Sequence, residues 1–318
     1  VWSTDTRKRV RTITLRDHSG RIEELSVSPD GTSFIARIGQ YGDDVAVLWD
    51  LLTGEEVHVF DSRNAGVTSV AYSPDGRYLL TGFDDTTISL WNTDSGRRVQ
   101  TFEGHTSAVR TVAFSSDGNY VASGSADGST ILWDAKQGEI IDSFVRDSVD
   151  AAVNAVGFSP DGTRIVSGMS FGYVSMWSVD DTQKSMNFDS VSGTLLSVAV
   201  SPDGRHILTG SRDGTAAIWD YRNVQPIRVF SAHSSSILSV EFSPDGRSFL
   251  TGSRDGTATK WDTVSGDRVF TLTDPHGGRI WDLAFSPDGR RILAGSTRSA
   301  TLWDARNGNA VRTLVGPT

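Results

Sequence analysis

Residues 104–134 read GHTSAVRTVAFSSDGNYVASGSADGSTILWD, and this stretch contains the pattern that decides the fold. Alternating apolar residues at 110–114 and 120–124 flank a Ser-Asp-Gly turn, and a second Asp-Gly turn leads into 130–133. Asp-Gly between alternating runs is a strong hairpin signal, because glycine tolerates the positive φ that such turns require. The stretch therefore predicts three antiparallel strands, and residues 139–144 supply a fourth.

The same pattern recurs along nearly the whole chain. A Ser-Pro-Asp-Gly tetrad or a near copy is followed each time by a tryptophan, and these are Trp49, Trp91, Trp133, Trp177, Trp219, Trp261 and Trp303. Successive tryptophans are 42, 42, 44, 42, 42 and 42 residues apart. A fixed period of this length indicates a repeat architecture. One four-stranded unit cannot bury its own faces, whereas units stacked in a ring bury a continuous core.

We therefore predict one all-β domain, a closed β-propeller of seven blades with four antiparallel strands per blade. The predicted blades cover residues 17–60, 61–102, 103–144, 145–188, 189–230, 231–272 and 273–314. Residues 1–15 remain as a surplus outer strand, because the residues after Trp2 repeat the end of a unit. In the interpretation we favour, Arg9–Leu15 is a clasp that completes the last blade, which leaves Val311–Leu314 redundant; the reverse assignment stays open. The missing initiator methionine favours a piece excised from a larger protein.

The units resemble the repeats of the WD40 family from about Asp17 to Leu314. In that family a His, a Ser or Thr, an Asp and the Trp of each unit form a hydrogen-bonded structural tetrad. Two units carry the full set, namely His105, Ser123, Asp127 and Trp133 in the third and His233, Thr251, Asp255 and Trp261 in the sixth. Phe171 stands where the fourth unit should have Asp, and the seventh unit is one residue short near Arg298. We expect such blades to be locally less stable, by about 1 kcal/mol for each lost buried hydrogen bond.

The composition is typical of a globular domain without a membrane span. Hydrophobic residues make up 37% of the 318 residues, and no apolar run approaches the roughly 18 residues that a span needs. Cysteine is absent, which excludes disulfides, thiolate metal sites and a cysteine nucleophile. The net charge of −9 argues against nucleic acid as a partner. We expect a cytoplasmic domain, monomeric in isolation, that binds neither nucleic acid nor membrane.

The recurring His, Ser and Asp superficially suggest a hydrolase triad. A nucleophilic serine needs an aimed base and an open site with an oxyanion hole, and an active site does not recur in several blades. No two of the six histidines lie at i,i+2 or i,i+4, and each Asp-Gly turn offers one carboxylate, so no metal site is indicated. We predict no enzymatic activity, no metal and no cofactor; a propeller hydrolase is an alternative that we do not favour.

The resemblance also implies where a partner binds, because in WD40 propellers the loops entering the first strands form a peptide-binding rim. The corresponding positions here are Arg21, Glu23, Thr68, Asp84, Ala108, Arg110, Asn154, Ser170, Phe171, Thr194, Leu196, Arg212, Ser236, Leu238, Arg254, Arg279, Trp281 and Thr297. Units five to seven place three apolar residues at equivalent positions, with three arginines beside them. These are Leu196, Leu238 and Trp281, with Arg212, Arg254 and Arg279.

Tryptophan and arginine are enriched in binding hot spots, and arginine binds carboxylates and phosphates in bidentate geometry. We therefore predict a protein or peptide partner that is acidic or phosphorylated near an apolar anchor. Arg110 and Phe171 are predicted to extend this site. The alternative for Trp281 is burial in the core, like the blade tryptophans.

The predicted function is a non-catalytic scaffold or sensor domain of a larger signalling protein, for which fold analogy supports only the class. A second interpretation is the substrate receptor of a cullin-type ubiquitin ligase. It depends on Ile207–Arg222, which resembles the adaptor-docking WDxR box of such receptors, and on Trp303–Arg306, which repeats its end.

Overall fold

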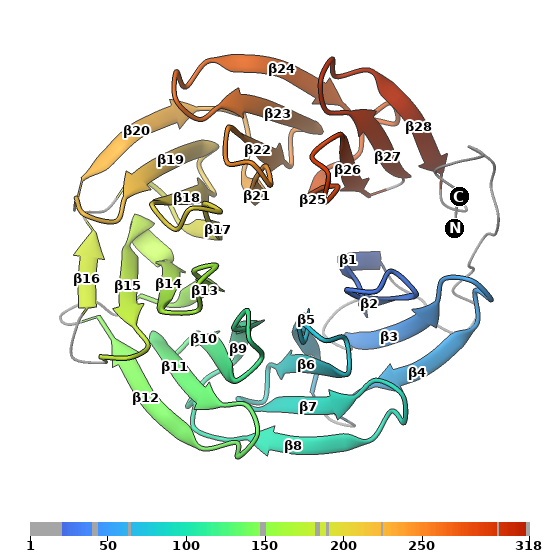
Figure 1. Cartoon of the computed structure of the whole chain (residues 1–318), viewed down its shortest axis with the longest axis vertical. Helices are drawn as coiled ribbons and strands as arrows, with labels where there is room; N and C mark the ends of the chain where they lie inside the picture. Colours follow the sequence, from blue (N-terminus) through green and yellow to red (C-terminus); the bar gives the residue numbers. More distant parts are fainter. Residues whose placement is uncertain are drawn as a thin grey trace.

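The computed structural model describes residues 21–39, 44–62, 65–146, 151–181, 185–188, 191–223, 225–297 and 299–315. These residues form seven sheets of four antiparallel strands, arranged as blades in a ring (Figure 1). Within each sheet the strands follow chain order, from the first at the centre to the fourth at the periphery (Figure 1). The single 3-10 turn η1 (Ser170–Gly172) is the one helix in these ranges. The predicted all-β, seven-bladed propeller is confirmed.

The strands of blades 1 to 4 are β1–β4 (Arg21–Val27, Ser33–Gly39, Val45–Asp50, Glu56–Phe60), β5–β8 (Val67–Tyr72, Tyr78–Phe83, Ile88–Asn92, Arg98–Phe102), β9–β12 (Val109–Phe114, Tyr120–Ser125, Ser129–Asp134, Ile140–Val145) and β13–β16 (Val153–Phe158, Arg164–Met169, Val174–Ser178, Ser185–Phe188). Those of blades 5 to 7 are β17–β20 (Leu195–Val200, His206–Ser211, Thr215–Asp220, Pro226–Ser231), β21–β24 (Ile237–Phe242, Ser248–Ser253, Thr257–Asp262, Arg268–Thr273) and β25–β28 (Ile280–Phe285, Arg291–Ser296, Ser299–Asp304, Ala310–Val315). No helix in the described ranges is long and apolar enough to cross a membrane.

The Ser-Pro-Asp-Gly motif joins the first two strands of each blade through a repeated set of hydrogen bonds. In blade 2, Ser73 Oγ donates to Asp75 Oδ1 over 2.6 Å and accepts the amide of Tyr78 over 2.9 Å. Gly76 has a φ of +71°, a region that glycine enters without steric cost. The same Ser–Asp bond occurs in all seven blades, so the motif fixes the register of every first hairpin.

The hydrophobic core lies between neighbouring blades. Ile88 and Leu90 of blade 2, for example, are in one buried cluster with Val112, Ile131 and Trp133 of blade 3. Equivalent clusters join blades 1 and 2, 3 and 4, 4 and 5, 5 and 6, and 6 and 7. Blades 2 to 6 thus each bury one face against the preceding blade and the other against the following one, as expected of a repeat that cannot fold alone.

The fourth strand of the last blade is β28, which pairs with β27. The pairing of β27 with β28 shifts register at Trp303. The third and fourth strands of blades 1, 2, 3, 5 and 6 show the same shift at their own tryptophans. Of the two candidate outer strands, the structure places the C-terminal one beside β27 in blade 7, because it follows β27 through a short turn. The clasp predicted for Arg9–Leu15 lies outside the described residues.

Blade 7 departs from the repeat where its sequence is one residue short. Ala294 stands where blades 2 to 6 carry the Ser or Thr that accepts the tryptophan N–H, and Trp303 Nε1 is buried without a partner among the described residues. Asp274, from the loop before β25, is buried nearby and accepts the Ser299 hydroxyl over 2.8 Å. Ala294, Trp303 and Asp274 lie around the same point of the blade. Among the described residues, blade 7 therefore has an unmet buried donor there.

Ala294→Ser is expected to stabilise the propeller by about 1 kcal/mol, because the new hydroxyl accepts the buried indole N–H. Thermal unfolding measures the effect. The matched control is Ala122→Ser in blade 3, which adds a hydroxyl at a fully buried alanine beside a tetrad that is already complete. A melting temperature lowered equally by both substitutions would contradict this account of blade 7.

Candidate functional site

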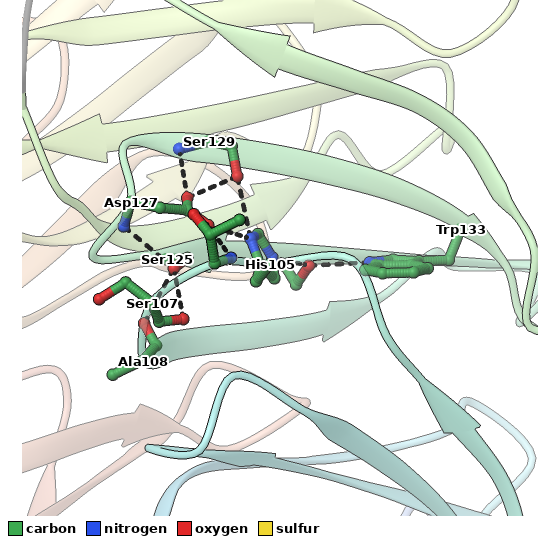
Figure 2. Close-up of polar contacts among 9 residues, drawn as sticks. His105, Ser107, Ala108, Ser125, Asp127, Ser129 and Trp133 are labelled. Atoms are coloured by element: carbon green, nitrogen blue, oxygen red, sulfur yellow. Dashed lines mark hydrogen bonds and ion pairs between the residues drawn. The ribbon is translucent and has the colours of Figure 1, made fainter.

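Four side chains of blade 3 form one chain of hydrogen bonds (Figure 2). Trp133 Nε1 donates to Ser123 Oγ over 2.8 Å, and His105 Nε2 lies 2.7 Å from that hydroxyl. On the other side of the ring, His105 Nδ1 lies 3.2 Å from Asp127 Oδ2. Blade 6 has the same arrangement with His233, Thr251, Asp255 and Trp261. These contacts tie the loop before the first strand to the next three segments of its own blade.

The protonation states follow from the surroundings of the His105 tetrad. Burial lowers the pKa of His105 even though Asp127 lies beside it, so the imidazole is neutral at pH 7. Burial by itself would raise the pKa of Asp127, but hydrogen bonds from Ser129 and from the amide of Thr106 outweigh it and lower that pKa to about 2. The neutral ring therefore donates from Nδ1 to the carboxylate and accepts the Ser123 hydroxyl proton at Nε2.

The order of hydrogen bonds matches that of a Ser-His-Asp hydrolase triad. The burial of the serine, however, distinguishes this tetrad from a catalytic triad. Ser123 is fully buried, and its oxygen already accepts the indole N–H of Trp133. A nucleophilic serine must be open to substrate beside oxyanion donors. Within the described ranges, no group of three or more His, Asp or Glu residues is placed to hold a metal ion. The tetrad geometry is that of a structural brace.

The Trp–hydroxyl bond persists in blades 2, 4 and 5, where the tetrad is incomplete. The donor–acceptor pairs are Trp91–Thr81 at 2.8 Å, Trp177–Ser167 at 2.8 Å and Trp219–Thr209 at 3.2 Å. In blade 4, Phe171 replaces the aspartate; its side chain is 65% exposed and its φ is +61°. A bulky residue at positive φ is uncommon and strained. Phe171 is therefore displayed at the surface and does not enter the tetrad.

Every first strand contains a one-residue bulge near its start. The residues that the strand register skips are Glu23, Thr68, Arg110, Asn154, Leu196, Leu238 and Trp281. A bulge leaves its residue unpaired and re-aims the side chain out of the ladder. All seven bulge residues are among the positions that the sequence predicted to lie on the rim. At these positions the backbone departs from the regular pairing of the rest of each first strand.

We call Leu196, Leu238, Trp281, Arg212, Arg254 and Arg279 together the Trp281 patch. Its three apolar residues occupy the bulges of β17, β21 and β25, and these strands lie side by side. Arg254, from the turn between β22 and β23, has its guanidinium carbon 5.7 Å from the centroid of the Trp281 ring. Thr297 accepts the indole N–H over 3.2 Å. Trp281 is half-buried and belongs to none of the core clusters of the described residues.

The arginines of the patch project from backbone positions that are fixed. The amides of Arg212 and Arg254 donate to carbonyls of the loops that precede β17 and β21, over 2.8 and 2.9 Å. The side chains of Arg212, Arg254 and Arg279 are exposed, and in the part of the chain that the structure describes no carboxylate forms an ion pair with them. The three guanidinium groups, beside the apolar residues of the patch, can bind an anionic group.

Arg110 and the alternative ligase box are differently placed. Arg110 is exposed, but its Nη1 donates to Asn154 Oδ1. Asn154 Nδ2 in turn donates to the Leu195 carbonyl over 3.0 Å. In the ligase box, Arg222 pairs with Asp220 over 3.3 Å and lies 5.4 Å over the Tyr221 ring. Both arginines are therefore engaged within the propeller.

Three carboxyl groups on the inner strands were not predicted from the sequence. Burial raises the pKa of Glu24 and of Glu241 to about 7, and it also raises the pKa of Asp282. The signal was present in the repeats. Glu24 and Asp282 stand where the other five repeats carry Ser, Thr or Ala, and Glu241 stands where the other six carry Ala, Gly or Ser.

Seven four-stranded blades, buried His–Ser/Thr–Asp–Trp tetrads and bulge residues at equivalent positions define a WD40-type propeller. The family model for the WD domain, G-beta repeat, matches residues 224–262 and 266–304. A model described as the IFT122 first beta-propeller matches residues 66–232, more than half of the chain. One for eukaryotic translation initiation factor eIF2A matches residues 2–127. The chain belongs to the WD40 β-propeller family.

A curated relative is similar over part of the chain. It is a guanine nucleotide-binding protein subunit beta of Arabidopsis thaliana, 35% identical over 89 residues, which is 26% of this chain and 22% of that protein. Propellers of this kind are generally non-catalytic interaction domains. The comparisons therefore support a scaffold for protein partners.

Proposed function

We propose that this propeller is a non-catalytic, cytoplasmic interaction module of a larger signalling protein, and that the Trp281 patch binds a protein segment carrying carboxylates or phosphates beside an apolar anchor. The observation that carries the proposal is the cation–π pair of Arg254 and Trp281, together with the exposed Arg212 and Arg279, which form no ion pair within the described part of the chain. A flat indole takes an apolar side chain, and guanidinium groups bind a carboxylate or phosphate at its edge.

The test is binding to a peptide array that varies net charge, phosphorylation and one aliphatic or aromatic residue. Affinities of the best binders are then measured by fluorescence polarisation. A rim variant carrying Trp281→Ala, Arg212→Glu and Arg254→Glu is expected to bind about 100-fold more weakly, because it loses the apolar platform and reverses two charges. Added salt should weaken wild-type binding as well.

The matched control carries Val264→Ala, Arg205→Glu and Arg290→Glu, which changes the net charge equally. Val264 is 88% exposed, and the side chains of Arg205 and Arg290 are 66% and 76% exposed. All three lie on turns at the other ends of the strands. Equal weakening in both variants, or a preference for basic peptides, would refute the proposed site.

A further inference from the structure

The seven bulge residues divide the rim into a polar part and an apolar part. Those of blades 1 to 4 are polar or charged, and those of blades 5 to 7 are apolar. In blade order they are Glu23, Thr68, Arg110, Asn154, Leu196, Leu238 and Trp281. Among the bulge positions, apolar contacts with a partner are therefore confined to one side of the ring.

A second set of equivalent residues begins the turn between the second and third strands. In blades 2 to 7 the amide of this residue donates to a carbonyl of the loop that precedes the first strand of the same blade, over 2.8 to 3.1 Å. In blade order these residues are Asp84, Ala126, Ser170, Arg212, Arg254 and Thr297. Because the backbone bond is the same, their side chains start from equivalent points of the rim. The charge at these points is negative on blade 2, positive on blades 5 and 6, and zero on the other three blades.

Asp84 is fixed on blade 2 by two hydrogen bonds with Gly66. The Asp84 amide donates to the Gly66 carbonyl over 3.1 Å, and Asp84 Oδ1 accepts the Gly66 amide over 3.0 Å. The residue is nevertheless exposed. The next carboxylate, that of Asp85, is used within its own turn, where it accepts the amide and the hydroxyl of Thr87 over 3.1 and 2.7 Å. Asp84 is therefore placed to present a carboxylate at the surface of blade 2.

Blade 2 stands opposite blades 5 and 6. It is three blades away from each of them, in opposite directions around the seven-bladed ring (Figure 1). The bulge residues lie on the first strands, at the centre, and the turn residues lie further out, between the second and third strands. A line across the centre therefore meets a cation, an apolar residue, a hydroxyl and an anion in that order. On blades 6 and 2 these are Arg254, Leu238, Thr68 and Asp84.

We propose that the partner is an extended segment that lies across the centre of the ring, with its acidic group over blades 5 and 6 and a basic group over Asp84 of blade 2. The inference rests on the function proposed above, because it takes the Trp281 patch as the anchor. Arg212 and Arg254 lie outside the apolar residues of that patch, so a segment that fills both directs its free end toward the centre. Beyond the centre, the Asp84 carboxylate attracts a lysine or arginine and repels a second acidic group. The charges of the rim thus select the composition of the partner and its direction.

The test uses three synthetic peptides that differ only at one end. Each contains two aspartates, one phenylalanine and a flexible Gly-Ser spacer, made in lengths from about six to fourteen residues. The last two residues are lysine, glutamine or glutamate. Fluorescence polarisation at low salt is expected to show that wild type binds the lysine peptide of the best length about tenfold more tightly than the glutamate peptide, with the glutamine peptide between them. Added salt should reduce this difference.

Asp84→Lys is expected to reverse the preference, so that the glutamate peptide binds about tenfold more tightly than the lysine peptide. Asp84→Asn should abolish the preference. It keeps an oxygen that accepts the Gly66 amide, so it tests the same point if the lysine variant folds poorly. The matched control is Asp94→Lys, which makes the same charge change at an exposed turn of blade 2, at the other end of its strands. This control should keep the wild-type preference.

Three outcomes would overturn the proposal, and they are distinguishable. If the three peptides bind wild type equally, but more tightly than they bind the rim variant, the Trp281 patch stands and the partner leaves it outward over blades 5 to 7. If wild type and the rim variant bind every peptide alike, the proposed function fails and this inference fails with it. If Asp94→Lys changes the preference as much as Asp84→Lys, the effect comes from net charge and not from a contact on the rim.

Discussion

Trp133→Ala is expected to destabilise the propeller by about 4 kcal/mol, the largest loss that we predict for a single side chain. The indole is fully buried, and its N–H is the donor to Ser123. Its ring contacts Phe102 and His105 edge-on, with centroids 5.5 and 6.1 Å apart. Truncation leaves a cavity between blades 2 and 3 and removes one bond of the tetrad. Denaturant unfolding followed by tryptophan fluorescence measures the loss.

The same substitution at Trp281 is the control and also decides the role of that residue. Trp281 is half-buried and makes one indole hydrogen bond, to Thr297, together with the stacking of Arg254. Because the indole is partly exposed and belongs to none of the core clusters of the described residues, we expect Trp281→Ala to cost about 2 kcal/mol, half the loss at Trp133. A loss as large as that of Trp133→Ala would mean that Trp281 is a core residue, and the proposed patch would then lose its anchor.

Gly172→Ala is expected to cost about 3 kcal/mol or more, because both the backbone conformation and the space are wrong for a side chain. Its φ is +77°, and a Cβ built there would lie 1.6 Å from the carbonyl oxygen of Val191. That oxygen belongs to the loop entering blade 5, so the clash forces blades 4 and 5 apart beside Phe171. Thermal unfolding of the variant measures the cost.

Gly31→Ala separates the two causes. Gly31 has a similar φ of +70°, but a Cβ there meets nothing within 4 Å. This variant should therefore be destabilised only by the left-handed backbone conformation, by about 1 kcal/mol. Equal losses at Gly31 and Gly172 would show that the contact with Val191 yields easily and that the two blades are not tightly apposed at this point.

The repeat made most of the fold predictable, since Ser-Pro-Asp-Gly and the spaced tryptophans mark every hairpin. Blade 7 shows the limit. His276 stands at the register of the tetrad histidine, yet it is exposed, and Asp274 is buried nearby. The shortened turn of that blade carries no aspartate to hold a histidine. Asp274, from the same loop as His276, has taken the interior position and accepts the Ser299 hydroxyl, which no alignment of repeats indicates.

The candidate site was predictable as a set of positions but not as a set of contacts. The bulge residues could be located by their spacing from the first-strand valine, because the backbone irregularity is the same in each blade. The bond between Arg110 and Asn154, which joins neighbouring blades, could not be derived from either repeat alone. The same holds for Glu24 and Asp282, which are far apart in sequence but lie on β1 and β25, two strands in contact.

The central claim is that the Trp281 patch holds a protein partner, and affinity capture from a lysate of the source organism tests it most directly. Wild type, the rim variant and the matched opposite-face variant are compared by quantitative mass spectrometry after each is shown to fold. We predict a partner that wild type and the opposite-face variant retain and the rim variant loses. A partner retained equally by all three would contradict the account and place the binding surface elsewhere on the propeller.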